Sequence, residues 1–170
     1  MIVLNKTIAV TIVSIITLCV SSVSAQDCKC CSEKHRAFDF WVGEWNVYDT
    51  SGNQVGKNTI TRTQNGCVLQ ENWESKTMTG TSYNHFNQND SLWHQTWIDN
   101  QGGSLYIQGD VKDGVMTMGT KMIQGKTGKY YNRITWTPMK DGSVIQKWDL
   151  LNSKDEVFQT LFIGKYVRKE

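Results

Sequence analysis

The chain has 170 residues and a formal net charge of +2, which fits one domain with nearly balanced charge. It contains no basic run and no acidic tail, so nucleic acid and anionic membrane surfaces are disfavoured as partners. Seven tryptophans and a single proline indicate a domain whose core relies on large aromatic side chains.

Residues 1–25 have the pattern of a secretory signal peptide. Lys6 is the only charge among them, an apolar run extends from Ile8 to Val20, and small residues lead up to Ala25. The run is short for a membrane span and is interrupted by Ser and Thr. We therefore expect cleavage after Ala25, export to the periplasm or the extracellular space, and no membrane contact afterwards. Without Lys6 the net charge of +2 becomes +1.

Residues 26–37 form a polar lead-in that carries cysteines. After cleavage Cys28, Cys30, Cys31 and Cys67 remain, and four cysteines allow three full pairings. An exported protein can form disulfides. A bridge from Cys67 to the cluster at 28–31 would close a loop of about forty residues and contribute on the order of 3–4 kcal/mol. The alternative is a soft-metal site that combines the cluster with His35.

A short helix is expected at the start of the domain proper, which spans residues 38–170. Ser32 is suited to cap a helix that begins with Glu33. Phe38, Trp41 and Val42 then supply apolar side chains at helical spacing. We interpret this segment as a plug for one end of the fold.

Alternation begins at Gly43 and continues to the end of the chain. Trp45 and Val47 point to one face of the first strand, and Glu44 and Asn46 point to the other. Nine clusters of Asn, Asp, Gly and similar turn residues follow. They lie at 51–53, 64–66, 76–77, 87–90, 100–103, 113–114, 125–128, 141–142 and 152–155.

Nine short connections predict ten consecutive antiparallel strands, with no segment long enough for a crossover helix. An open meander of this size would leave two bare edges, which closure removes. The predicted fold is therefore all-β, a single antiparallel up-and-down β-barrel of about ten strands, with a two-sheet sandwich as the alternative.

Several strands show which of their faces is buried. Met116, Met118 and Met122 share one face, which we expect to point inward. In the strand at 92–99 we place Trp93 and Trp97 inward, because two exposed indoles on one strand would form a costly apolar patch.

Carrying this choice along the chain predicts an interior with polar groups among tryptophans. A barrel of about ten strands is wider than its side chains can fill, so a pocket is expected. Within it, Arg133 would pair with Glu71 or bind a ligand carboxylate. The candidate ligand-binding residues are Glu71, Trp73, Asn84, Trp93, Gln95, Trp97, Arg133, Gln146 and Trp148. The alternative is that they form a buried network that binds nothing.

Four stretches of the chain, at 38–45, 93–99, 133–138 and 164–168, resemble the calycin group of barrels. They are most similar to exported, lipocalin-like bacterial domains of unknown function. The resemblance covers residues 38–170. Gly43-x-Trp45 corresponds to the calycin G-x-W motif, which implies that Arg168 from the last strand packs on Trp45. Related calycins carry fatty acids, retinoids or haem, but none of these ligands transfers residue by residue.

Three functions remain open at this point. The first is a binding module that holds a small amphipathic or hydrophobic ligand in the Trp-lined interior. The second is an enzyme, which is less favoured because the sequence has no catalytic signature and implies no cofactor. His85 and His94 could be cross-strand neighbours that ligate a metal or haem iron, although both are expected to point outward. The third is a structural or interaction domain, with Tyr130 and Trp136 as an outward platform for sugars.

Overall fold

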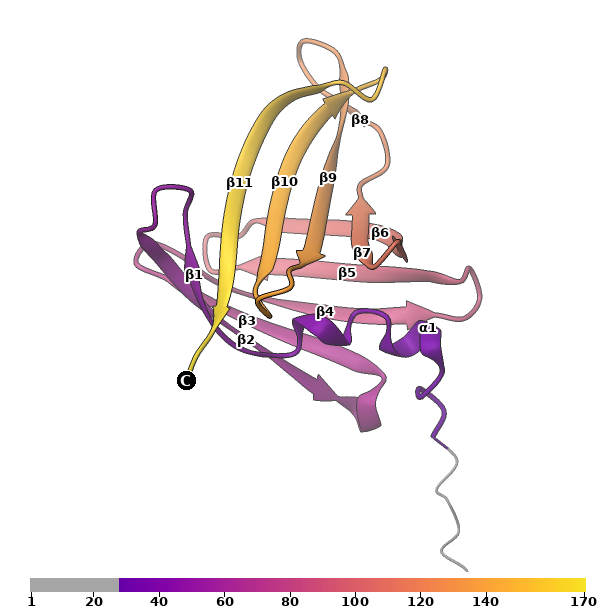
Figure 1. The fold of residues 1–170 in the computed structure, drawn as a ribbon. Coiled ribbons are helices and arrows are strands. Elements are labelled where there is room, and N and C mark those ends of the chain that lie inside the picture. Colours follow the sequence, from indigo (N-terminus) through magenta and orange to yellow (C-terminus); the bar gives the residue numbers. More distant parts are fainter. Residues whose placement is uncertain (1–27) are drawn as a thin grey trace, which may run out of the picture.

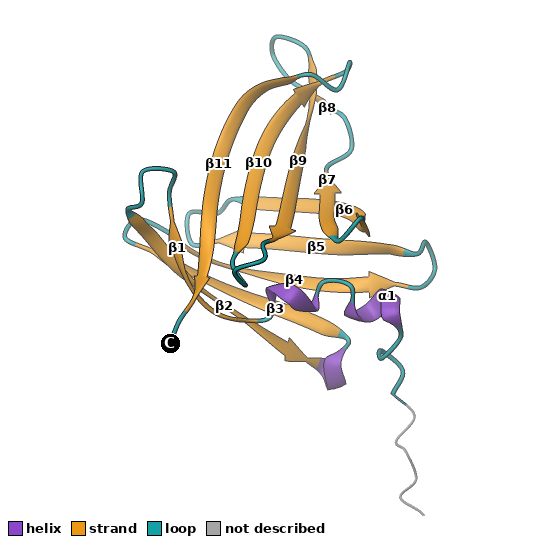
Figure 2. Cartoon of the chain, in the orientation of Figure 1, coloured by secondary structure: helices purple, strands orange, loops and turns teal. Residues whose placement is uncertain are grey.

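The computed structural model describes residues 28–170 and shows a closed antiparallel β-barrel with one short α-helix, as predicted (Figures 1 and 2). The predicted signal peptide at 1–25 lies outside the described residues. The strands are β1 (Gly43–Tyr48), β2 (Gln54–Thr63), β3 (Val68–Ser75), β4 (Thr79–Asn87), β5 (Leu92–Asp99), β6 (Ser104–Lys112), β7 (Val115–Gly119), β8 (Ile123–Gln124), β9 (Lys129–Pro138), β10 (Val144–Asn152) and β11 (Val157–Arg168).

Ten of these strands form the barrel. The hydrogen-bonded order runs β10-β11-β1-β2-β3-β4-β5-β6-β7-β9, and pairing of β9 with β10 closes the ring. The two-residue strand β8 pairs only with β9. In Figure 1, β9, β10 and β11 extend beyond the other barrel strands on the side away from α1, and β8 lies beside their far end.

The turns lie at the clusters of Asn, Asp and Gly that the sequence indicated, because these residues tolerate positive φ. Asp113 and Gly114 adopt φ values of 52° and 79° in the tight turn between β6 and β7. Asn65 (φ 55°) lies in the short 3-10 turn Gln64–Gly66 between β2 and β3. Short connections of this kind make consecutive strands pair antiparallel.

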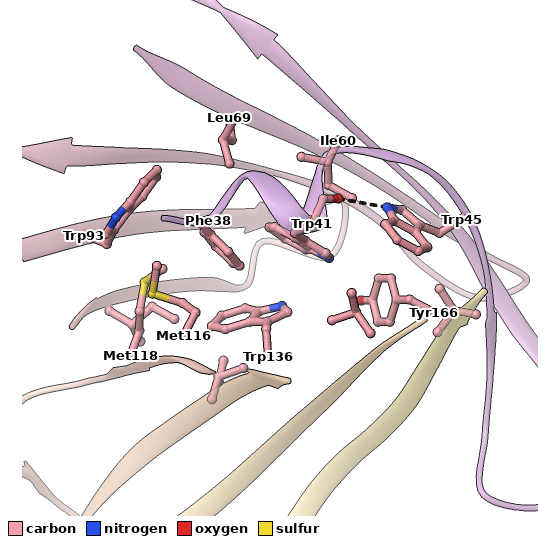
Figure 3. Packing of buried hydrophobic residues seen from close by; sticks show 14 residues of the cluster. Phe38, Trp41, Trp45, Ile60, Leu69, Trp93, Met116, Met118, Trp136 and Tyr166 are labelled. Carbon is pink, nitrogen blue, oxygen red and sulfur yellow. Dashed lines mark hydrogen bonds between the residues drawn. The ribbon is translucent and has the colours of Figure 1, made fainter. Parts of the chain in front are cut away.

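The N-terminal segment closes one end of the barrel. Helix α1 (Glu33–Arg36) is capped by the Ser32 hydroxyl, which accepts a hydrogen bond from the His35 N–H at 3.5 Å. A 3-10 turn, η1 (Asp39–Trp41), follows it. Phe38 and Trp41 are fully buried, and their rings stack with centroids 4.9 Å apart. Figure 3 shows both rings among the strands, so the segment acts as the expected plug.

Aromatic side chains from the barrel complete this closed end. The Phe38 ring meets Trp93 and Trp136 edge-on, with centroids 5.6 and 5.2 Å away. Trp93 also donates a hydrogen bond from Nε1 to the Lys34 carbonyl oxygen at 3.1 Å, which fixes α1 to β5.

The first and last strands close the barrel beside the plug. Trp45 and Arg168 are register partners on β1 and β11. The Arg168 guanidinium lies 4.3 Å from the centroid of the Trp45 ring, as the calycin resemblance implied. Its Nη1 donates to the Val42 carbonyl oxygen at 3.1 Å, and Trp45 Nε1 donates to the Trp41 carbonyl oxygen at 2.9 Å.

Two disulfides use all four described cysteines. Cys30 pairs with Cys67 across a sequence separation of 37, and the two Cα atoms lie 5.0 Å apart. This bridge ties the lead-in to the barrel, as expected for Cys67. Cys28 pairs with Cys31 within the lead-in. The cysteines are therefore not free to ligate the soft metal that was considered as an alternative.

Two face predictions were wrong. Met122 is 47% exposed, because β7 ends at Gly119 and the chain leaves the barrel wall there. On β9 the inward face carries Asn132, Ile134 and Trp136, one residue out of step with the predicted inward set that included Arg133. The step matters because successive residues of a strand point to opposite faces.

No helix in the described part of the chain is both long and apolar enough to cross a membrane.

Candidate functional site

The barrel interior contains a cavity of about 260 Å³ above the plugged end, just below the range of about 300–1,000 Å³ for small-molecule sites. Its lining is mainly aromatic and aliphatic, with three polar side chains and one tyrosine. The lining residues are Glu71, Trp73, Met78, Gln95, Trp97, Leu105, Ile134, Gln146, Trp148, Leu161, Phe162 and Tyr166.

Glycines on neighbouring strands position the aromatic rings of the wall. A Cβ atom at Gly56 would lie 2.5 Å from the Trp73 ring, and one at Gly80 would clash with Trp97. Gly164 leaves room for Phe162 on the same strand, because a Cβ atom at position 164 would lie 2.6 Å from the Phe162 ring. The rings can therefore lie flat along the barrel wall, which leaves space at the centre.

A hydrogen-bonded network around Glu71 forms the polar part of the cavity. Glu71 is only 5% exposed. Its Oε1 accepts from Asn58 Nδ2 at 2.7 Å, and its Oε2 accepts from the Ser82 hydroxyl at 2.6 Å. Asn84 Nδ2 donates to the Ser82 hydroxyl oxygen at 2.9 Å, and Gln95 Nε2 donates to Asn84 Oδ1 at 2.7 Å. The network thus extends from β2 across β3 and β4 to β5.

A second branch links this network to the last two strands. Asn58 Nδ2 also lies 3.4 Å from the Tyr166 hydroxyl, which donates to Gln146 Oε1. On the wall above, Trp148 Nε1 donates to Asn132 Oδ1 at 2.8 Å. The polar side chains of the cavity are therefore held in fixed orientations by hydrogen bonds.

Burial shifts the acidity of both ionisable groups in the network. It raises the pKa of Glu71, and the hydrogen bonds from Ser82 and Asn58 oppose this only in part. Burial, followed by the nearby Glu71 charge, raises the pKa of Tyr166 well above its ordinary value. Glu71 has no cationic partner among the groups that shift its pKa, and none of the described Lys or Arg residues lines the cavity.

Six of the nine predicted site residues line the cavity: Glu71, Trp73, Gln95, Trp97, Gln146 and Trp148. Asn84 is fully buried and belongs to the polar network but does not line the cavity. Trp93 belongs to the packed core at the plugged end.

Arg133 does not reach the interior. Its side chain is 35% exposed on the outer face, and its Nη2 lies 3.9 Å from Asp149 Oδ2 on the paired strand β10. The expected Arg133–Glu71 pair and the expected carboxylate clamp are therefore wrong. Trp136, predicted to be an outward platform for sugars, is fully buried against the plug.

Sequence reasoning missed Tyr166 and Phe162 on β11. A usable signal existed, because Arg168 was expected to lie on Trp45 at the barrel end. Counting back from Arg168 in steps of two places Tyr166, Gly164 and Phe162 on the same inward face. Asn58 was missed because β2 is polar on both faces.

The outer surface carries two further features. His85 and His94 are cross-strand partners, as predicted, with ring centroids 5.4 Å apart. His94 Nε2 lies 2.8 Å from Asp90 Oδ2, and its Nδ1 contacts the Tyr106 hydroxyl. Nowhere between residues 28 and 170 do three or more His, Cys, Asp or Glu side chains converge as a metal site. A shallow hollow of about 850 Å³ also lies along β1–β5 and is lined mostly by outward-pointing side chains.

The fold and the site together define a class: a closed antiparallel barrel, plugged at one end, with an aromatic cavity built over a buried polar network. Comparison of the chain with protein-family models found no match, and comparison with curated proteins found none either.

Proposed function

We propose that the protein binds a small amphipathic or hydrophobic molecule inside the barrel. The observation that carries the proposal is the cavity of about 260 Å³, in which indole walls face a fixed set of polar groups. Small-ligand sites combine these two features, because apolar contact provides affinity and a few oriented polar groups provide specificity. The apolar body of the ligand would lie against Trp73, Trp97 and Trp148, and its polar end would meet Glu71 and Gln146.

The proposal includes export and a lipocalin-like assignment. Two disulfides support an oxidising compartment. The closed barrel and the Arg168–Trp45 contact support the resemblance to calycins.

Native mass spectrometry of the protein recovered from its own compartment tests the binding function. We expect a bound organic mass that leaves on denaturation. Leu105→Trp fills the cavity, because Leu105 lines it, and should abolish that mass. Ile98→Trp is the matched control, because Ile98 is 51% exposed and the same indole is added outside. An empty wild-type protein that also fails to bind small aromatic compounds would overturn the proposal and favour a structural role.

A further inference from the structure

Glu71 is an acidic group in the cavity without a compensating positive charge. It lies on β3 and is almost fully buried. Its hydrogen-bond partners, Asn58 and Ser82, are both neutral. Burying a carboxylate without an opposite charge is costly, so proteins normally pair such a group. In the described part of this chain no basic side chain reaches the cavity.

Among the residues hydrogen-bonded to Glu71, the remaining capacity is for accepting rather than donating, although Trp73 in the cavity wall also has a buried Nε1 donor with no partner among the described residues. Asn58 Nδ2 is already committed to Glu71 and Tyr166. The Ser82 hydroxyl donates to Glu71, and the Tyr166 hydroxyl donates to Gln146. Asn58 Oδ1 is buried with no partner among the described residues, and a carboxylate accepts more than the two hydrogen bonds that Glu71 receives. A ligand group with several N–H donors would satisfy these acceptors.

The apolar walls suit the same kind of group. Trp73, Trp97 and Trp148 line the cavity together with Phe162. Aromatic faces attract cations, and indole does so most strongly among the side-chain rings. Trp73 and Phe162 meet edge to face with centroids 6.2 Å apart, so two walls of different orientation meet at one corner of the cavity.

From these observations we infer that the cavity selects a small organic cation, namely an aliphatic or arylalkyl ammonium, with its nitrogen at Glu71 and its apolar body among the tryptophans. The inference deepens the proposed function and rests on it. The inferred ligand is a cation, whereas the predicted interior position of Arg133 had suggested a carboxylate ligand.

The test compares three probes of the same size and different charge: 2-phenylethylammonium, 2-phenylethanol and phenylacetate. Binding to the mature, oxidised protein is followed by tryptophan fluorescence and isothermal titration calorimetry. We expect the ammonium to bind at least about tenfold more tightly than the alcohol, and the carboxylate to bind weakest. In Glu71→Gln the ammonium and the alcohol should bind within about twofold of each other, because the variant keeps the shape and removes the charge.

Glu74→Gln is the matched control. Glu74 lies on the same strand as Glu71, but it is exposed and lies on the outer face. It should leave the preference for the ammonium unchanged. If Glu71→Gln does not fold, the pH dependence of wild-type binding replaces it: ammonium affinity should fall as Glu71 becomes protonated at low pH, while alcohol affinity should not. Tyr166 is the other titratable group in the network, and its pKa is raised away from that range.

The outcomes separate the inference from the function on which it rests. Equal binding of the alcohol and the ammonium, or tighter binding of the carboxylate, would overturn the inference and leave the binding function standing. Failure of all three probes to bind would overturn the inference, and an empty native protein in the mass spectrum as well would remove the binding function. A preference for the ammonium that survives in Glu71→Gln would show that the tryptophans alone select the cation, and would overturn the role of Glu71.

Discussion

Glu71 and Arg168 are two charged side chains in contrasting surroundings, one buried among neutral groups and one packed on an aromatic ring. Glu71 lies inside with only neutral partners, and burial raises its pKa. Arg168 lies at the end of the last strand with its charge against the Trp45 ring. The first arrangement costs stability unless a ligand compensates it, whereas the second stabilises the closure of the barrel.

Replacing Glu71 by Gln should stabilise the ligand-free protein at neutral pH. A raised pKa in the folded state means that, between the unfolded and folded pKa values, the folded protein holds a proton that the unfolded chain has lost. Wild-type stability therefore falls as the pH rises through this window, and Glu71→Gln removes that fall. We expect a gain near pH 7 of the size usual for a single substitution, about 1 kcal/mol, and no gain at acidic pH, where Glu71 is protonated in both the folded and the unfolded protein.

Urea unfolding of both proteins from pH 3.5 to 7.5 provides the measurement. The difference between the two proteins isolates Glu71 from the other acidic residues, some of which, such as Asp149, have lowered pKa values and act in the opposite direction. A difference that stays constant with pH would show that Glu71 does not titrate in this window.

Arg168→Ala should lower the free energy of unfolding by about 1–2 kcal/mol, through loss of the contact with Trp45 and of the hydrogen bond to the Val42 carbonyl oxygen. Lys169→Ala is the control, because Lys169 pairs with the exposed Glu44 at the surface, and such pairs contribute at most about 1 kcal/mol. Denaturant unfolding compares them. Equal losses of stability in the two variants would mean that packing of Arg168 on the Trp45 ring does not contribute to the free energy of unfolding.

At the scale of elements, the lead-in segment is joined to the barrel by one disulfide and bridged within itself by the other. The Cys30–Cys67 bridge reaches from the lead-in to the turn before β3, while Cys28–Cys31 closes a separation of only 3 residues. Cys28 and Cys31 are exposed, whereas Cys30 is buried. The two bridges should therefore differ both in their contribution to stability and in their access to reductant.

Removal of the long bridge by Cys30→Ser with Cys67→Ser should cost about 3–4 kcal/mol, following the entropy of the loop it closes. Removal of the short bridge by Cys28→Ser with Cys31→Ser should cost clearly less. Under a graded dithiothreitol titration, alkylation and mass spectrometry should detect Cys28 and Cys31 as free thiols first. Simultaneous opening of both bridges would contradict the expected difference in exposure.

Across the whole molecule, the barrel interior is divided into a packed half and a half that contains the cavity. Phe38 and Trp41 fill the end near α1, where they meet Trp93, Trp136 and Tyr166 (Figure 3). The other end keeps the cavity because glycines let its aromatic rings lie along the wall. Tyr166 lies between the two halves, because it meets Trp41 and also lines the cavity.

Trp41→Ala should destabilise the whole barrel by about 3–5 kcal/mol. It removes a fully buried indole, and the closed ring of strands cannot move inward to fill the cavity that is left. Tyr83→Ala, which truncates a 50% exposed ring on the outer face of β4, should cost less than about 1 kcal/mol. Thermal unfolding followed by circular dichroism measures both. A small loss for Trp41→Ala would mean that the N-terminal segment is not part of the cooperative unit.

The sequence by itself determined the features that depend on local pattern. Alternation and turn residues predicted ten barrel strands in antiparallel order. The inward face with Trp93, Gln95 and Trp97 was correct because only that face of the strand carries indole rings. Ser32 marked the helix start, and Gly43-x-Trp45 marked the closing contact with Arg168. Six of the nine candidate residues were placed in the cavity for the same reason.

Only the tertiary structure decided the surroundings of Arg133 and the charge of the site. On β9 the face with Ile134 and Trp136 is the more apolar one, and the opposite face was predicted because the assignment was carried over from the strand at 92–99. The choice depends on partners far away in the chain: the plug at Phe38 and Trp41 covers Trp136, and Asp149 on β10 receives Arg133 outside the barrel. One step of register therefore removed the expected cation from the interior and left Glu71 there without a counter-charge, because neighbouring residues of a strand always point to opposite sides of the sheet.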